Sequence, residues 1–255
     1  MTSPALFAAV GEVGKGFIQE RDSSSLPCQA KPDEVFCFDW AREHIDRFGT
    51  PTVQHLELVV VSVLIGFAIA FALALFAHRR SWLQPPLLAA TGVLYTIPSI
   101  AFFFLLLPIT GIGRTTAIIV LAAYTLQIIY RNTMLGLANV PISAKDAARG
   151  MGYTDRQILW RVELPLAIPE IVAGLRVAIV STIAIATLAV FIGGGGLGTQ
   201  IYGGGNLTFP TSVFIALAIV LLMAMVFHIA LLVAQRFLTP WRKSRAASKT
   251  ERQLV

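Results

Sequence analysis

The sequence predicts an all-α fold: a bundle of about five membrane-spanning helices joined by polar loops. Of the 255 residues, 56% are hydrophobic and only 13% are charged, and the mean hydropathy is +0.72. A soluble domain of this length would carry roughly 25% charged residues. Apolar runs also recur along the chain, each about as long as the roughly 20 residues that an α-helix needs to cross a bilayer. The chain is therefore predicted to be a polytopic membrane protein.

Five apolar runs follow the first 52 residues. The predicted spans are 56–77, 87–107, 115–137, 171–192 and 213–234. They divide the chain into an N-terminal segment (1–52), a transmembrane region (53–238) that contains a polar loop (138–169), and a basic tail (239–255).

The charges predict the orientation of these spans. Residues 1–57 hold 5 of the 20 Lys and Arg but 9 of the 14 Asp and Glu. The remaining bases gather at Arg79-Arg80, in the region 131–161 and in the tail, and basic residues favour the cytoplasmic side of a membrane. We therefore expect the N-terminus outside, and the C-terminus and the polar loop in the cytoplasm. Because the bases flank apolar runs, they indicate membrane topology and no nucleic-acid partner.

The N-terminal segment has no secretory signal pattern. Residues 34–48 have the spacing of an amphipathic helix lying on the membrane surface, and a loosely ordered leader is the alternative. Cys28 and Cys37 are the only cysteines, and both fall on the side predicted to be outside, where a disulfide can form. Two unrelated thiols remain the alternative. No metal site is expected, because the spacing of a four-ligand set is missing.

The polar loop carries a dense set of local signals between Asp146 and Pro169. Small residues at 147, 148, 150 and 152 come first, and Gly152 marks a sharp turn. Thr154 followed by Gln157 has the spacing of a capping box. Pro165 and Pro169 follow. We predict a helix, a turn at Gly152, a short second helix, a proline stop and then a membrane helix.

This loop resembles the cytoplasmic "EAA" loop of the permease subunits of ABC importers, with Asp in place of the usual Glu and Val162 in place of the usual Ile. The resemblance implies that the loop forms a coupling helix that docks on an ATP-binding subunit. A two-helix amphipathic linker in an ordinary membrane protein is the alternative. The residues assigned to ATPase coupling are Asp146, Ala147, Ala148, Gly150, Gly152, Tyr153, Leu164, Pro165 and Pro169.

Four further stretches, at 95–99, 107–113, 130–133 and 186–193, resemble the osmoprotectant branch of these permeases. That resemblance implies import of glycine betaine, choline, carnitine or a related quaternary amine across a bacterial plasma membrane. It also implies three partners: an ATP-binding subunit, a second permease subunit (the same chain or a paralogue) and an extracytoplasmic substrate-binding protein. Residues 1–49 lie outside the resemblance.

No enzymatic chemistry is predicted for this chain. The glycine-rich stretch 193–198 lacks the Gly-Lys-Ser/Thr ending of a phosphate-binding loop and is expected to be a flexible turn on the outer side. No cofactor is therefore expected, and ATP would be bound by the partner subunit. Carboxylates are scarce inside the spans, which disfavours ion-driven transport. An ion-coupled or facilitative transporter of small polar solutes is the main alternative, and a membrane scaffold is a third.

Two tyrosines and a proline are candidates for the translocation pathway. Tyr95 and Tyr124 fall within the second and third spans, and Pro98 lies close to the first of them. Aromatic faces hold quaternary ammonium groups through cation–π attraction. Ordinary packed or lipid-facing aromatics are the alternative.

Overall fold

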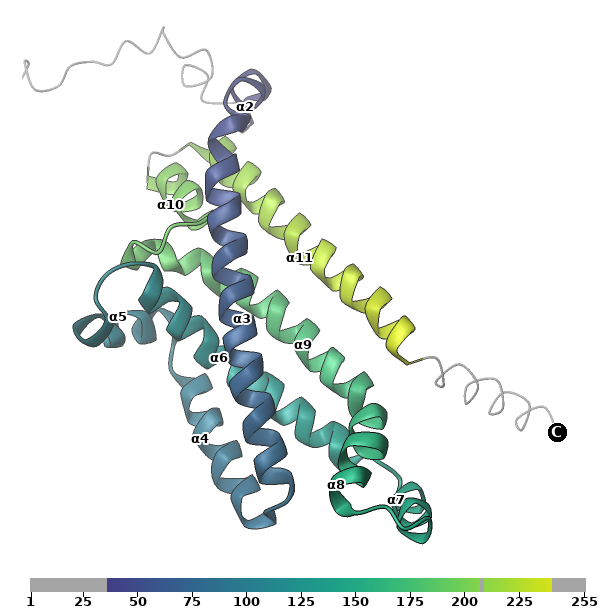
Figure 1. Cartoon of the computed structure of the whole chain (residues 1–255). Helices are drawn as coiled ribbons and strands as arrows, with labels where there is room; N and C mark the ends of the chain where they lie inside the picture. Colours follow the sequence, from purple (N-terminus) through teal and green to yellow (C-terminus); the bar gives the residue numbers. More distant parts are fainter. Residues whose placement is uncertain (1–35, 207–208, 240–255) are drawn as a thin grey trace, which may run out of the picture.

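The computed structural model describes residues 36–206 and 209–239, and Figure 1 shows their arrangement. No strand occurs among these residues. The helices are α2 (Phe38–Glu43), η1 (Ile45–Phe48), α3 (Gly49–His78), η2 (Ser81–Leu83), α4 (Gln84–Thr96), α5 (Ser99–Thr110), α6 (Arg114–Ala138), α7 (Ile142–Gly150), α8 (Asp155–Ile158), η3 (Leu159–Glu163), α9 (Leu164–Ala186), η4 (Thr187–Ile192), α10 (Gly198–Asn206) and α11 (Pro210–Leu238).

Four of the helical stretches in the described ranges are long and apolar enough to cross a membrane without a break. They are Ile45–His78, Arg114–Ala138, Asp155–Ile192 and Pro210–Leu238. The predicted all-α membrane bundle is therefore confirmed, and four of its five predicted spans are continuous helices.

The second predicted span, 87–107, is not a single straight helix. It is broken into α4 and α5, which meet at an angle of 98°. Pro98 explains the break, because it has no N–H to donate and it moves the preceding residue out of the helical region. Ile97 is accordingly extended, with ψ of 128°. The pair runs from the end of α3 to the start of α6, which lie at opposite ends of the bundle (Figure 1), so together they supply the fifth crossing.

Helix α6 lies between α3 and α9 at the centre of the bundle (Figure 1). Gly66 of α3 sits so close to α6 that a methyl group there would overlap the Thr125 hydroxyl. Ala70 and Ala74 continue the same face of α3 at intervals of four residues, and both are fully buried. Small residues at this spacing let two helix backbones approach closely, as in membrane helix pairs generally.

The two ends of the bundle are distinguished by their contacts. At the end away from the polar loop, Arg114 at the start of α6 pairs with Glu57 in the N-terminal part of α3. The glycine-rich stretch 193–198, which was expected to be a flexible turn, is not helical before Gly198, where helix α10 begins. Gly196 in this loop is tied back to α3, since its N–H donates to the Gln54 side chain.

The N-terminal helix differs from its prediction. Helices α2 (Phe38–Glu43) and η1 (Ile45–Phe48) are separated at His44, and η1 runs directly into α3, so the first span begins earlier than residue 56. Trp40 stacks on His44, with 4.8 Å between ring centroids, and meets Phe209 edge-on at 4.6 Å. The described part of this N-terminal segment therefore packs against the start of α11 and does not lie free of the bundle.

The close approach of α3 and α6 gives a test of the packing. Gly66→Ala should lower the thermal unfolding midpoint of the purified protein in detergent, because overpacking a tight site costs about 1–3 kcal/mol. Gly92→Ala is the matched control, because the nearest atom to the methyl group it adds would be Gln127 Nε2, at 3.7 Å. That substitution should leave the midpoint unchanged or raise it, since Ala favours a helix over Gly. Equal effects of the two substitutions would contradict the close contact.

Candidate functional site

The polar loop forms a helix–turn–helix at one end of the bundle, at the bottom of Figure 1. Helix α7 ends in a Schellman turn: the Tyr153 N–H donates to the Ala148 carbonyl at 3.1 Å, and the Gly152 N–H donates to the Arg149 carbonyl at 2.9 Å. Gly152 has φ of +81°, a conformation that favours glycine. The sharp turn predicted at Gly152 is therefore present.

The second helix of the loop begins with the predicted capping box. The Thr154 hydroxyl accepts from the Gln157 backbone N–H at 3.4 Å, and the side-chain Oε1 of Gln157 accepts from the Thr154 backbone N–H at 2.8 Å. Both unpaired donors at the start of α8 are thereby satisfied. The direction in which the chain leaves the turn is fixed by these two bonds.

The predicted proline stop is wrong. The chain stays helical from Asp155 to Ile192, through Pro165 and Pro169. Pro165 is the second residue of α9, and Pro169 lies inside the same helix. The turn before it, Leu159–Glu163, is a π-helix, whose wider winding helps the helix continue where proline removes a bond.

The small residues of α7 do not all face the same way. Asp146, Ala147 and Gly150 are exposed, whereas Ala148 is buried against the rest of the chain. Asp146 pairs with Arg149 on the same helix at 3.3 Å. Ala148 was predicted to be a docking residue, but it packs inward, and only its neighbours are available to a partner. Leu164 is also buried, in the small core beneath the loop.

Sequence reasoning missed a buried carboxylate at the base of the loop. Glu163 accepts from the Lys145 ammonium at 2.8 Å and from His78 Nε2 at 2.7 Å, and its side chain is only 9% exposed. No local pattern could have revealed this cluster, because His78 lies 85 residues away in the sequence. The one available signal is a carboxylate directly before the Leu-Pro pair.

The two partners of this carboxylate influence its charge, and it lies in the polar loop before the apolar run at 171–192. Burial would raise the pKa of Glu163, but the hydrogen bonds from Lys145 and His78 outweigh it and hold the pKa below its ordinary value. The carboxylate is therefore ionised at neutral pH. Its contribution to stability is present above the unfolded-state pKa and is lost as the pH falls through the folded-state pKa.

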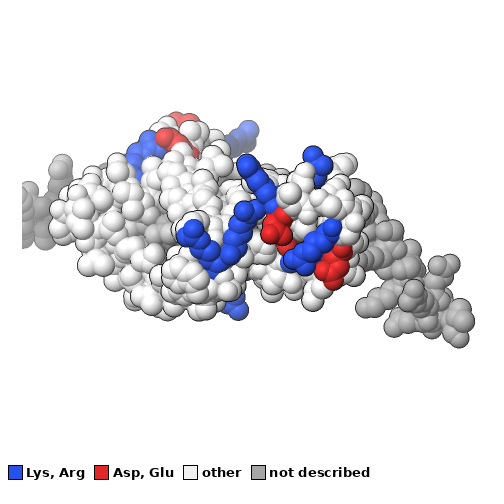
Figure 2. Space-filling view, turned by 60° about the horizontal axis from the view of Figure 1, so that its bottom comes forward, with Lys and Arg blue, Asp and Glu red and all other residues white. Residues whose placement is uncertain are grey.

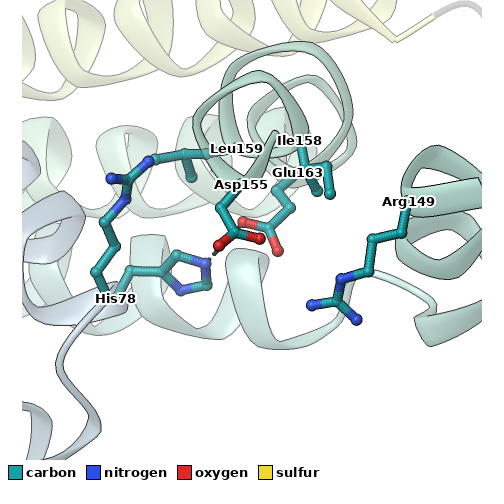
Figure 3. A pocket seen from close by; sticks show the side chains of 7 residues that line it. His78, Arg149, Asp155, Ile158, Leu159 and Glu163 are labelled. Atoms are coloured by element: carbon teal, nitrogen blue, oxygen red, sulfur yellow. Dashed lines mark hydrogen bonds and ion pairs between the residues drawn. The ribbon is translucent and has the colours of Figure 1, made fainter. Parts of the chain in front are cut away.

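A cavity of about 410 Å³ opens beside this cluster. Figure 3 shows His78 and Glu163 on one side of it and Arg149 on the other. Figure 2 shows the same end of the molecule, where blue Lys and Arg side chains are spread over the face with a few acidic side chains among them. The loop thus lies on the basic end of the bundle, as the charge pattern predicts.

The candidate pathway residues meet at the break between α4 and α5. The rings of Tyr95 and Tyr124 lie edge to face, with 5.8 Å between centroids, and Phe102 lies at the same distance from Tyr124. The Tyr124 hydroxyl donates to the Ile97 carbonyl next to Pro98. Tyr124 is buried, while Tyr95 is 43% exposed. The three predicted residues are therefore adjacent, and of the two tyrosines Tyr95 is the one that a ligand could reach.

The predicted disulfide joins Cys37 to Cys28, and Cys28 lies outside the described residues. The bridge therefore stays a prediction. Cys37 is buried, and its N–H donates to the Thr211 hydroxyl at 3.0 Å. No group of three or more His, Cys, Asp or Glu side chains that could hold a metal occurs in the described part of the chain.

Residues 62–244 match the family described as "Binding-protein-dependent transport system inner membrane component". The chain belongs to this family. Its relatives include the choline transport system permease protein OpuBB of Bacillus subtilis, 35% identical over 189 residues (74% of this chain and 87% of that protein). The carnitine transport permease protein OpuCB of Listeria monocytogenes is 37% identical over the same shares. The osmoprotectant import permease protein OsmW of Salmonella typhimurium is 40% identical over 158 residues (60% of this chain and 74% of that protein).

Solved transporter structures share the fold of this permease. An inward-facing structure of the MetNI methionine ABC transporter superposes with a TM-score of 0.68 at 22% identity, over 75% of this chain and 96% of the other. The crystal structure of an amino acid ABC transporter with histidines gives a TM-score of 0.68 at 20% identity, over 78% and 98%. The resemblance to permeases of this transport family, first suggested by the polar loop, is confirmed. The protein is an inner-membrane transport component.

Proposed function

We propose that this permease imports a small osmoprotectant such as choline, glycine betaine or carnitine, driven by ATP hydrolysis in a partner subunit. The exposed, structured polar loop is the observation that carries the proposal. It projects from the cytoplasmic end of the bundle, where an ATP-binding subunit can reach it. The names of the relatives support the class of substrate, since they transport choline, carnitine or osmoprotectants.

The exposed side of α7 is the docking surface for the ATP-binding subunit. Ala147 and Gly150 present little side-chain bulk along this side, beside the exposed Asp146, so another protein can approach the helix backbone closely. Met151 and Trp160, which are 67% and 54% exposed, flank it with apolar surface. ATP is bound by the partner, so this chain acts without an enzymatic activity of its own.

The remaining partners lie in the membrane and outside it. A second permease subunit, either another copy or a paralogue, completes the pathway beside the broken α4–α5 span. An extracytoplasmic substrate-binding protein delivers the substrate to the outer end. A quaternary ammonium group passing the break would meet the exposed face of Tyr95, which is a favourable contact for a cation.

Transport assays in proteoliposomes test this function. Vesicles that hold the permease, its ATP-binding subunits and the substrate-binding protein should take up labelled choline, glycine betaine or carnitine only with ATP on the side of the polar loop. Ionophores that collapse proton and sodium gradients should leave this uptake unchanged, and the purified permease alone should not hydrolyse ATP. Uptake that needs an ion gradient and no ATP would refute the proposal.

The orientation is proposed from the distribution of bases and has its own test. Single cysteines introduced by Ser3→Cys and Ser248→Cys, in a background carrying Cys28→Ser and Cys37→Ser, should react with a membrane-impermeant thiol reagent from opposite sides. In intact cells only the first should be labelled, and permeabilised cells provide the control that both sites are reactive. Labelling of both in intact cells would exclude an external N-terminus with an internal C-terminus.

The turn of the loop should be needed for coupling more than for folding. No atom outside the turn lies within 4 Å of a Cβ at Gly152, so Gly152→Leu meets only the backbone strain of a positive φ, about 1–2 kcal/mol. We expect this variant to reach the membrane in nearly wild-type amounts and to lose most of its uptake, because the new side chain projects beside the docking surface.

Gly111→Leu is a strict control for that substitution. Gly111 also has a positive φ, of +78°, and open space around its Cβ, but it lies at the end of α5, away from the polar loop. Its ψ of 177° places it in a region essentially restricted to glycine, so the backbone strain of this control is not smaller than that of a left-handed turn residue. The Gly111→Leu variant should keep at least half of the wild-type uptake, as measured in whole cells and normalised to the amount of protein in the membrane. If the two variants transport equally well, the turn has no special part in coupling.

A further inference from the structure

Glu163 connects three segments that are far apart in the sequence. It lies at the end of η3 and runs directly into α9, while Lys145 belongs to α7 and His78 is the last residue of α3. Each carboxylate oxygen has its own partner: Oε1 accepts from Lys145 at 2.8 Å and Oε2 accepts from His78 at 2.7 Å. One side chain thus joins the loop helix to two membrane helices.

The burial of this cluster separates it from the other ion pairs in the described ranges. The Glu163 side chain is 9% exposed, whereas Glu57 and Arg114 at the outer end are 53% and 43% exposed. Exposed pairs contribute little, because water screens them and their side chains lose freedom on pairing. A buried carboxylate that loses a partner keeps an unpaired charge in a poorly solvated site, which makes its contacts hard to break one at a time.

Helix α7 has few other attachments to the bundle. Ala148 is the single buried residue along its described length. Its N-terminal end is joined to α6 through residues 139–141, of which Val140 is buried, and its C-terminal end is joined through Gly152 to α8. The bond from Lys145, about midway along α7, adds an attachment between these two ends. Through Glu163 this bond links α7 to His78 of α3, a helix that is not adjacent to it in the chain.

From this arrangement we infer that Glu163 is a positioning residue for coupling: it transmits displacement of α7 to α3 and α9. This role rests on the proposed function, in which the ATP-binding subunit moves α7 during its cycle. Displacement of α7 would pull on Lys145 and, through one carboxylate, on the cytoplasmic ends of two membrane helices together. The cavity of about 410 Å³ beside the cluster leaves room for these side chains to move (Figure 3).

The ratio of substrate transported to ATP hydrolysed tests this role, because a residue needed only for folding would lower both rates in proportion. Glu163→Gln keeps the size of the side chain but removes its charge. In proteoliposomes with the ATP-binding subunits, the substrate-binding protein and labelled choline, glycine betaine and carnitine supplied together, we expect the ratio to fall at least fivefold. ATP hydrolysis per complex should stay within about twofold of wild type.

If the Glu163→Gln permease does not assemble with the ATP-binding subunits, substitutions at Lys145 give a second measurement. Lys145→Gln breaks only the link to α7 and should lower the same ratio, whereas Lys145→Arg keeps the cation and should hold it within about twofold of wild type. Glu57→Gln is the control at the outer end, where it breaks the exposed pair with Arg114; its ratio should equal that of the wild type.

The outcomes separate this inference from the proposed function. Wild-type vesicles that show no ATP-dependent uptake would overturn the proposed function and this inference together. Wild-type vesicles that transport normally, with an unchanged ratio in Glu163→Gln and Lys145→Gln, would overturn the positioning role alone. A proportional loss of both rates would do the same, because it assigns the cluster to folding. A lowered ratio in Lys145→Gln that Lys145→Arg restores supports it.

Discussion

Close contact between helix backbones is the constraint on which this bundle depends. Lipid tails are as apolar as leucine, so burying apolar side chains does not by itself draw membrane helices together. What does so is the packing allowed by small residues: Gly66, Ala70 and Ala74 bring α3 onto α6, and Gly174 of α9 sits directly against Asn132 of α6. Helix α6 is thereby fixed between its two neighbours, and the other helices are arranged around that trio.

The hydrocarbon of the bilayer offers no hydrogen bonds, so backbone groups that are freed where a helix is interrupted must find partners within the protein. The break at Pro98 frees the Ile97 carbonyl, and the Tyr124 hydroxyl, from the neighbouring helix, donates to it. A second case occurs where α9 tightens into a 3₁₀ turn: the Ile183 carbonyl is left over, and a ring nitrogen of His55 lies 3.1 Å from it. Irregular backbone inside this bundle is therefore tied to α3 and α6, so neither break can move independently.

The sequence predictions were accurate for features that depend on neighbouring residues and failed for contacts between residues far apart in the chain. Hydropathy and local patterns found four of the spans, the turn at Gly152 and the cap at Thr154, because each depends on neighbouring residues. Pro165 was misread, since a proline in the first turn of a helix and one that ends a helix look alike without knowledge of the preceding π turn. The Glu163 cluster was missed altogether, because its His78 partner is distant in sequence and only the antiparallel packing of α3 against α9 brings the two together.

A helix that receives force at an exposed surface is useful only if its contacts resist that force. The Schellman turn and the capping box fix where α8 begins relative to α7, and the unbroken helix from Asp155 to Ile192 carries that geometry into the membrane. The chain connections hold the two ends of α7, but along its length the helix buries only Ala148. The buried carboxylate holds the middle of α7, at the point where the loop helix, the end of the first span and the start of the fourth converge. Its position at this junction follows from packing that the small residues of α3, α6 and α9 make possible.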